Sequence, residues 1–297
     1  MRIGVDLGGS KIEVAAFNGL SALARRRIAT PQGDYLGTVM AVAGLVEAIE
    51  NELGQRGTVG IGIPGTESAQ TGLIKNANST CLIGKPLKRD LQAMLQREVR
   101  LANDANCFAL SEAIDGAGQG AETVFGVILG TGVGGGIVIR EQVLTGANGI
   151  AGEWGHNALP NPSAAELAGP ACYCGRSGCV ETWLSGPGMQ RDHLAVTGNT
   201  ADPASIAASA AAGDAACQAT LQRYAERLAR ALAVVINILD PQVIVLGGGL
   251  SNIDHLYDAV PRLWLPHVFS DHIATRLKKH RHGDASGVRG AAWLWGE

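Results

Sequence analysis

The sequence predicts an α/β fold built from two related lobes with a cleft between them. Strand and helix patterns alternate along the chain, and one hairpin pattern with a glycine-rich turn occurs twice. At 297 residues the chain exceeds the usual size of a single hydrophobic core. We predict one lobe from residues 1–115 and 287–297 and a second lobe from residues 116–286.

The first hairpin pattern lies at the amino terminus. Arg2–Leu7 predicts a buried strand, Gly8–Ser10 a tight turn and Lys11–Phe17 a returning strand. The second copy comprises Thr123–Leu129, Gly130–Gly135 and Gly136–Arg140. Two hairpins with the same order of strand, turn and strand indicate that the lobes are related.

Helix and strand patterns fill the rest of the chain. The spacing of apolar residues predicts a helix over Thr38–Leu53 and a longer one over Ala219–Leu239, which ends before Asp240-Pro241 because the residue before a proline disfavours helical angles. Further expected helices are Leu91–Arg97, Ala105–Ile114 and Gly287–Trp295, and further expected strands are Val59–Ile63, Val99–Leu101 and Val243–Leu246. The last of these strands runs into Gly247–Gly249, a third glycine turn.

The composition argues against several classes of protein. The formal net charge is -3 and the sequence pI is about 6.2, so no global positive field would attract nucleic acid or anionic lipid. No apolar run has membrane-spanning length, and the chain begins with a strand pattern instead of a targeting segment. We therefore expect a cytoplasmic protein with neither nucleic acid nor membrane as a partner.

The three glycine turns are candidate nucleotide-binding elements. Glycine lets backbone N–H groups approach phosphate oxygens because it has no Cβ, although one such turn alone is usually only a bend. The first turn also carries Asp6 and Lys11, and a carboxylate beside an ammonium group suits Mg²⁺ and phosphate. The candidate nucleotide-binding residues are Asp6, Gly8, Gly9, Ser10, Lys11, Gly130, Thr131, Gly132, Val133, Gly134, Gly135, Gly247, Gly248 and Gly249.

These turns resemble the motifs of a known superfamily. Asp6–Lys11 is similar to the first phosphate motif of actin, heat-shock chaperones and sugar kinases, Leu129–Gly136 to its second phosphate motif, and Val245–Gly249 to its adenosine motif. Glu153–His156 and Cys172–Glu181 resemble the E-x-G-H and C-x-C-G-x-x-G-C-x-E signatures of the ROK family, named for repressors, open reading frames and kinases. The resemblance covers nearly the whole chain. It implies a two-lobed actin-like ATPase (ribonuclease H-like) fold with a zinc-binding loop.

Four residues of these signatures form a candidate zinc site. His156, Cys172, Cys174 and Cys179 supply one imidazole and three thiolates, which is the donor set of a tetrahedral structural zinc ion. Clustered cysteines in a reducing compartment favour a metal over disulfides. The alternative is that they are small buried residues of a loop. A zinc ion with no open coordination position would stabilise the loop and take no part in the chemistry.

The ROK resemblance also implies a catalytic base and a set of sugar-binding residues. Asp104 matches the family aspartate that deprotonates the attacking hydroxyl, although an Asn-Asp pair before a helix is, taken alone, usually an N-cap. By the same resemblance Glu153 and Glu181 accept hydrogen bonds from sugar hydroxyls, and His156 donates from the ring nitrogen that zinc leaves free. The full predicted sugar-binding set is Gly65, Asn78, Asn103, Asp104, Glu153, His156 and Glu181.

We therefore expect an ATP:hexose 6-phosphotransferase that uses ATP, Mg²⁺ positioned by Asp6 and a structural Zn²⁺. Similarity to bacterial fructokinases of the manno(fructo)kinase type favours conversion of D-fructose to fructose 6-phosphate, with mannose as a second substrate. Glucokinase and N-acetylhexosamine kinase are the alternatives within the family. A sugar-sensing ROK repressor is disfavoured because the phosphate motif starts at residue 6 and leaves no room for a preceding DNA-binding module. A chaperone-like ATPase is disfavoured by the zinc loop and Glu153. A homodimer is the family expectation.

Overall fold

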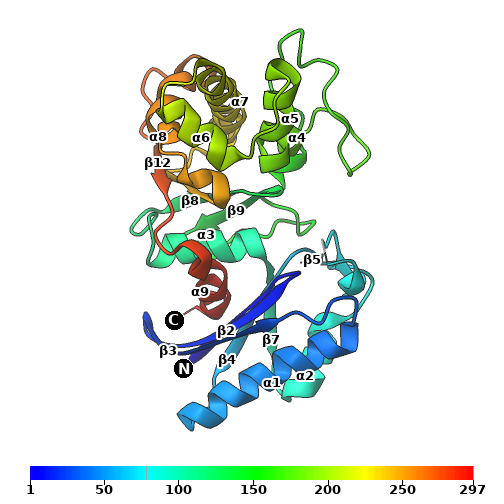
Figure 1. Ribbon diagram of the computed structural model, residues 1–297. Helices are drawn as coiled ribbons and strands as arrows, with labels where there is room; N and C mark the ends of the chain where they lie inside the picture. Colours follow the sequence, from blue (N-terminus) through cyan, green and yellow to red (C-terminus); the bar gives the residue numbers. More distant parts are fainter. Residues whose placement is uncertain (78, 297) are drawn as a thin grey trace. The chain divides into compact units, whose positions relative to one another are not determined.

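The computed structural model describes residues 1–77 and 79–296, and the chain forms two compact units (Figure 1). Unit 1 comprises Met1–Gly120, Gly136–Ala151 and His282–Glu297, and unit 2 comprises Ala121–Gly135 and Gly152–Arg281. Within the described residues, none of the helices combines the length and the apolar character needed to cross a bilayer.

Two five-stranded sheets have the same topology, which confirms the predicted α/β class. The strand orders are β3-β2-β1-β4-β7 and β10-β9-β8-β11-β12. In each sheet the two strands at one edge are antiparallel, and the last three strands in the order are parallel. The first sheet contains β1 (Arg2–Leu7), β2 (Lys11–Asn18), β3 (Ser21–Ala29), β4 (Thr58–Ile63) and β7 (Val99–Asn103). The second contains β8 (Thr123–Leu129), β9 (Val133–Ile139), β10 (Gln142–Val143), β11 (Val243–Gly247) and β12 (Arg276–Lys279).

The five predicted helices are present with shifted ends, and the described part of unit 2 contains four more helices that the sequence analysis did not predict. Those of unit 1 are α1 (Tyr35–Leu53), α2 (Leu87–Leu95), α3 (Asp104–Ile114) and α9 (Ser286–Trp293). Those of unit 2 are α4 (Val180–Leu184), α5 (Gly186–Thr197), α6 (Pro203–Ala211), α7 (Ala215–Leu239) and α8 (His255–Leu263). The helix predicted over 91–97 ends earlier because Gln96 adopts a positive φ of 51°. Helix α7 begins four residues earlier than predicted because Asp214 caps it by accepting from the N–H of Cys217.

Short elements complete the described chain. They are the strand pair β5 (Thr66–Glu67) and β6 (Ile74–Lys75), and the 3₁₀ turns η1 (Thr80–Leu82), η2 (Trp154–His156), η3 (Gly249–Asn252), η4 (Leu265–His267) and η5 (Gly283–Ala285). In unit 1 the apolar faces of β1, β2 and β4 pack with α1 and α2 into one buried core.

Helix α9 lies unusually close to its neighbours in unit 1. In the interior of β1, Gly4 faces the carbonyl group of Val288, and in β4 Gly60 faces that of Ala291. Gly290 of α9 in turn faces the carbonyl group of Cys107 in α3, and no Cβ fits at any of the three glycines. Glycine within a strand commonly marks such a close approach of another backbone.

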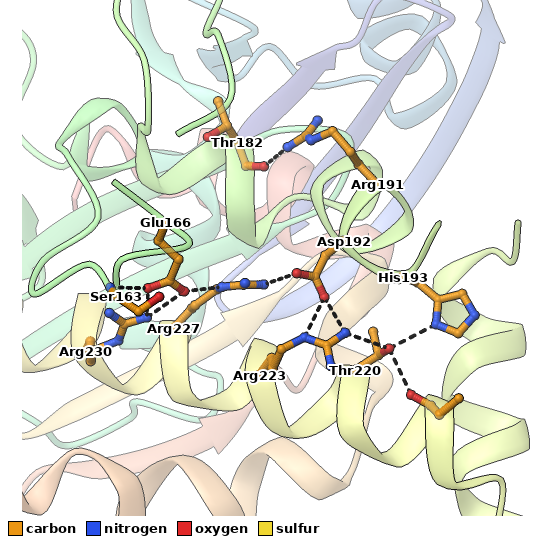
Figure 2. A network of polar contacts seen from close by, with 11 residues as sticks. Ser163, Glu166, Thr182, Arg191, Asp192, His193, Thr220, Arg223, Arg227 and Arg230 are labelled. Carbon is orange, nitrogen blue, oxygen red and sulfur yellow. Dashed lines mark hydrogen bonds and ion pairs between the residues drawn. The ribbon is translucent and has the colours of Figure 1, made fainter. Parts of the chain in front are cut away.

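The segment between Glu153–His156 and Cys172–Glu181 is held by buried ion pairs in unit 2 (Figure 2). Glu166, which is 8% exposed, accepts hydrogen bonds from the N–H of Ser163 and from the guanidinium groups of Arg227 and Arg230 on α7. Arg227 also contacts Asp192 on α5 at 2.8 Å. Residues 161–170 matched no motif in the sequence. In the structure this segment is held by the carboxylate of Glu166, which contacts both Arg227 and Arg230 of the long helix α7.

The electrostatics of Glu166 reflect this anchoring. Burial alone would raise the pKa of its carboxyl group, but hydrogen bonds from Arg227, from the N–H of Ser163 and from Arg230 outweigh burial and lower the pKa to about 2. Ionised Glu166 therefore stabilises the fold above its ordinary pKa of 4.5, and this contribution is lost as the pH falls toward 2.

We expect Gly290→Ala to lower the free energy of unfolding by about 1–3 kcal/mol, because the added methyl group forces α9 away from α3. The matched control is Gly44→Ala in α1, where a methyl group would meet open space. That change should raise the free energy of unfolding by roughly 0.5–1 kcal/mol through helix propensity. Urea unfolding measures both, and equal effects of the two changes would contradict the close packing.

We expect Glu166→Gln to lower the free energy of unfolding by about 3 kcal/mol near neutral pH, since Arg230 loses its buried counter-charge and Arg227 keeps only Asp192. The difference in the free energy of unfolding from the unmodified chain should shrink between about pH 5 and about pH 3. In this range the stabilising contribution of ionised Glu166 in the unmodified chain begins to be lost.

The control for this change is Glu226→Gln on α7, whose carboxylate accepts from exposed Gln222. It should alter the free energy of unfolding by less than about 0.5 kcal/mol. Urea unfolding at several pH values measures both variants. A Glu166→Gln protein as stable as the control would show that the ion pairs do not anchor the segment.

Candidate functional site

Three motifs that are far apart in sequence meet at one edge of the first sheet. Strands β1, β4 and β7 are parallel, so their carboxyl ends lie side by side, with Asp6 opposite Gly62 and Ile63 opposite Asn103. The carboxyl edge of parallel strands is where open α/β sheets commonly bind ligands. Unit 1 therefore brings the predicted magnesium ligand Asp6 to the same edge as the predicted base, Asp104, which follows β7 directly.

Asp6 is a perturbed carboxylate. Its burial, followed by the negative charges of Asp104 and Glu13, raises its pKa to about 6, while Lys11 and Arg27 act in the opposite direction. A divalent cation bound beside Asp6 would relieve the repulsion between its carboxylate and the neighbouring negative charges. The arrangement fits the predicted Mg²⁺.

Two further residues shape the surroundings of Asp6, and the sequence analysis missed both. A methyl group at Gly287, in the first turn of α9, would lie only 2.9 Å from Asp6 Oδ2. Glu13 is opposite Asp6 in the β1–β2 register, is 1% exposed, and forms ion pairs with Arg25 and Arg27 of β3. The available signals were a glycine at the start of a predicted helix and one acidic residue, Glu13, in a mostly apolar strand.

Asn103 and Asp104 occupy the amino end of α3. Asn103 is the N-cap residue: its Oδ1 accepts from the N–H of Ala105 at 2.9 Å, and its Nδ2 donates to the carbonyl oxygen of Gly65 at 3.2 Å. Asp104 is the first helical residue, and its Oδ1 lies 2.8 Å from the same Ala105 nitrogen. The N-terminal end of a helix favours a carboxylate in its ionised, proton-accepting form.

The loop after β4 joins the same cluster. Gly65 has a φ of 146°, and a methyl group there would lie 2.9 Å from the carbonyl oxygen of Lys75 and 2.9 Å from the Cβ of Ala77. Gly65 thus lies between Asn103 and the Lys75–Ala77 loop. Asn78, a predicted sugar ligand, lies outside the described residues.

The first glycine turn is held by hydrogen bonds at its base, and the residues at its tip are exposed. The N–H of Gly8 donates to the carbonyl oxygen of Lys11 at 2.9 Å, and Thr30 at the end of β3 bonds the carbonyl oxygens of Gly8 and Ser10. Gly9 and Ser10 are exposed. Lys11 Nζ lies 3.9 Å from the exposed carboxylate of Asp284, a solvated pair that leaves the ammonium group near the turn.

The second and third glycine turns meet in unit 2. Strands β8 and β11 are parallel neighbours, with Gly247 opposite Ile128, so both turns lie at one sheet edge. Gly248 has a φ of 78°, and a methyl group there would lie 2.7 Å from the carbonyl carbon of Leu129. Only glycine permits this contact between the two predicted nucleotide-binding turns.

The second turn is held by the segment that follows the last predicted zinc ligand. The N–H of Val133 donates to Glu181 Oε2 at 2.9 Å, and the N–H of Gly186 donates to the carbonyl oxygen of Gly130 at 2.7 Å. Trp154, the neighbour of Glu153, donates from Nε1 to the carbonyl oxygen of Gly134 at 3.0 Å. Residues predicted to contact sugar and residues predicted to contact phosphate therefore adjoin each other within unit 2.

A cavity of about 670 Å³ opens beside the third turn in unit 2. It is lined on one side by Asn252–His255, which follow the turn after Leu250 and Ser251, and on the other by α6 and α7. Most of its walls are alanine, leucine and isoleucine side chains, with the amides of Gln218, Gln222 and Asn252 among them. A volume of this size and an apolar wall with a few polar groups are typical of ligand pockets.

The four predicted zinc ligands come together in unit 2. Their ligand atoms all lie within 4.8 Å of one another, with 3.6 Å between Cys172 Sγ and His156 Nδ1 and 3.6 Å between Cys174 Sγ and Cys179 Sγ. Ligands about 2.3 Å from a tetrahedral zinc ion are separated by about 3.8 Å, so the set fits the ion. A hydrogen bond from Arg176 is the main cause that lowers the pKa of Cys174 to about 6, which favours the thiolate.

The second ring nitrogen of His156 contacts a residue that the sequence analysis did not select. His156 Nε2 lies 2.9 Å from the hydroxyl oxygen of Tyr173, and the two rings are edge to face. Tyr173 lies between the first two cysteines and is 78% exposed. Desolvation, followed by the negative charge of Glu181, raises its pKa to about 12, so its hydroxyl group stays protonated.

Comparison with known proteins gives a consistent result. The family model described as "ROK family" matches residues 2–297. A protein of Photobacterium profundum named N-acetyl-D-glucosamine kinase is 42% identical, over 99% of this chain and 99% of that protein. A ROK hexokinase structure from Thermus thermophilus is 33% identical with a TM-score of 0.88, covering 99% of this chain and 97% of that one. A ROK glucokinase from Streptomyces griseus, solved with glucose and AMPPNP, is 28% identical with a TM-score of 0.78, covering 99% and 98%.

Proposed function

We propose that this chain, which belongs to the ROK family, transfers the γ-phosphoryl group of ATP to the primary hydroxyl of N-acetyl-D-glucosamine. The observation that carries the phosphotransfer is the convergence of Asp6 and Asp104 at one edge of the first sheet. The choice of sugar rests on the Photobacterium profundum relative, whose name supports the expected N-acetylhexosamine alternative. D-Fructose, favoured by overall resemblance alone, has no comparable support.

In the proposed reaction Asp104 is the general base. Its carboxylate takes the proton of the sugar hydroxyl as that oxygen attacks the γ-phosphorus, and the bond to the β,γ-bridging oxygen breaks to release ADP. Phosphoryl transfer depends mainly on positioning and charge neutralisation, with one base near the nucleophile. Asp6 supplies a carboxylate for Mg²⁺, and its raised pKa is consistent with a site that awaits a cation.

The nucleotide is assigned to the glycine turns. Asp6–Lys11 and Gly130–Gly135 would place backbone N–H groups and the Lys11 ammonium group around the phosphates. The cavity of about 670 Å³ beside Gly247–Gly249 is the proposed pocket for the adenine base, whose faces would contact its alanine-rich walls. The amides of Gln218, Gln222 and Asn252 can both donate and accept hydrogen bonds, as a purine edge requires.

Sugar-binding roles are proposed for Glu153, Glu181 and His156 of unit 2 and, separately, for Gly65, Asn103 and Asp104 of unit 1. Carboxylates accept hydrogen bonds from hydroxyl groups, and they are the usual partners of a polyol. The hydroxyl of Tyr173, which already contacts His156 Nε2, is placed to extend that donor toward a ligand.

Zinc is proposed as a structural ion held by His156, Cys172, Cys174 and Cys179. Bound through Nδ1, it would fix the His156 ring and leave Nε2 protonated as a donor. Because α4 begins directly after Cys179, the ion would also hold the helix that carries Glu181.

The test of the proposed function is a coupled ADP-release assay with N-acetyl-D-glucosamine, glucose, N-acetylmannosamine, mannose and fructose. We expect kcat/KM to be at least about tenfold higher for N-acetyl-D-glucosamine than for fructose, because a site built for the acetamido group leaves polar groups unpaired with fructose. Asp104→Asn should lower kcat by about 100- to 10,000-fold and retain sugar binding. Preference for fructose, or near-normal turnover by Asp104→Asn, would overturn the respective assignment.

The metal assignment predicts one zinc ion per chain by elemental analysis. Cys174→Ser should lose most of the zinc and lower the thermal unfolding midpoint, because metal binding contributes to folding of the loop. Cys217→Ser is the matched control, since Cys217 is a buried cysteine of α7 outside the ligand cluster. Full zinc content in Cys174→Ser would contradict the site.

A further inference from the structure

The second glycine turn is proposed to bind a phosphate group, and the carboxylate of Glu181 already lies against this turn. Its Oε2 accepts from the N–H of Val133 at 2.9 Å. A methyl group on Gly132 would lie 2.7 Å from the same oxygen. In the structure the turn is shorter than the predicted Gly130–Gly135, because β9 already begins at Val133. The carboxylate therefore sits against the last residue of the turn, Gly132, and the first residue of β9.

A glycine turn attracts anions because its backbone N–H groups carry partial positive charge and no side chain blocks them. In this structure an anion of the chain itself is bound at the N–H of Val133. A nucleotide phosphate near the same N–H would face the Glu181 carboxylate at short range, and like charges at such separations repel strongly.

The position of Glu181 is set by the chain segment to which it belongs. It lies in the first turn of α4, which starts directly after Cys179, and the same segment contacts the turn again where the N–H of Gly186 donates to Gly130. The segment is thus held against the turn at two points. Within this frame, rotation of the Glu181 side chain is sufficient to free the N–H of Val133.

We propose that Glu181 is an internal anion of the phosphate turn and couples sugar binding to nucleotide binding. The proposal rests on the proposed function, in which Glu181 accepts hydrogen bonds from sugar hydroxyls. Without sugar, the carboxylate holds the N–H of Val133 and disfavours phosphate. When sugar hydroxyls engage Glu181, the carboxylate leaves that N–H, and the nucleotide phosphate takes its place. Glu181 is then a positioning residue that makes nucleotide binding dependent on sugar.

The first experiment measures the affinity for Mg²⁺-AMPPNP by titration calorimetry, with and without saturating N-acetyl-D-glucosamine. For the unmodified chain, sugar should tighten nucleotide binding by about 5- to 150-fold, the usual range of coupling between two sites. Glu181→Gln removes the negative charge, so it should bind the nucleotide about tenfold more tightly without sugar, and sugar should add little further.

The matched control is Asp271→Asn, which removes one negative charge from an exposed position of the same unit, away from the residues that line the proposed adenine pocket. It should retain the sugar-free affinity and the coupling of the unmodified chain. Equal or weaker sugar-free nucleotide binding by Glu181→Gln would overturn the proposal, because it would make Glu181 only a support of the turn.

A second measurement needs no variant. Amide hydrogen exchange at Val133 should be slow in the ligand-free protein and become faster when sugar alone is added, because the carboxylate that accepts from this N–H is withdrawn. Unchanged or slower exchange with sugar would contradict the proposal. Failure of the proposed function is distinguishable from failure of this proposal. The first would appear as no ADP release with any hexose. The second is measured by the sugar-free nucleotide affinity of Glu181→Gln, which needs no turnover.

Discussion

The backbone contact of α9 with β1, β4 and α3 is the constraint on which the geometry of unit 1 depends. Gly4 and Gly60 admit the helix to the sheet, and Gly290 admits it to α3. Because Asp6 is the second-last residue of β1 and Asp104 begins α3, this packing holds both carboxylates in their positions. Gly287 brings the start of α9 against Asp6 itself. The burial and, after it, the charge repulsion that raise the pKa of Asp6 are therefore sustained by a rigid frame. A divalent cation bound there would relieve the repulsion.

Unit 2 is organised by polar contacts instead. The predicted zinc ligands gather one loop, Glu181 and Gly186 hold the second glycine turn, and the ion pairs of Glu166 with Arg227 and Arg230 attach the connecting segment to α7 (Figure 2). The first two of these contacts join residues close to proposed ligand positions. The nucleotide, sugar and metal sites proposed for this unit would therefore not be independent, and a change of Glu181 would alter the surroundings of two proposed ligands.

Local patterns carried most of what the sequence predicted correctly. The repeated hairpin predicted the shared topology of the two sheets, and the spacing of Cys172, Cys174 and Cys179 predicted a cluster that the structure brings together. Contacts between distant segments left a weaker signal. The interior glycines Gly4 and Gly60 were visible, but only the fold reveals α9 as their partner, and Glu166 has no motif around it. For the sugar, the comparisons support the expected N-acetylhexosamine alternative better than fructose. The catalytic motifs used in the sequence analysis are shared by kinases of different hexoses, so they do not identify the sugar.

The most direct test of the central claim is ³¹P NMR of the product formed from ATP and N-acetyl-D-glucosamine. The account predicts a phosphomonoester resonance coupled to the protons of the C6 methylene group, formed in equal amount with ADP and absent when Asp104→Asn replaces the unmodified chain over the same interval. Release of inorganic phosphate without a sugar phosphate, or a phosphomonoester only when fructose is supplied, would contradict it.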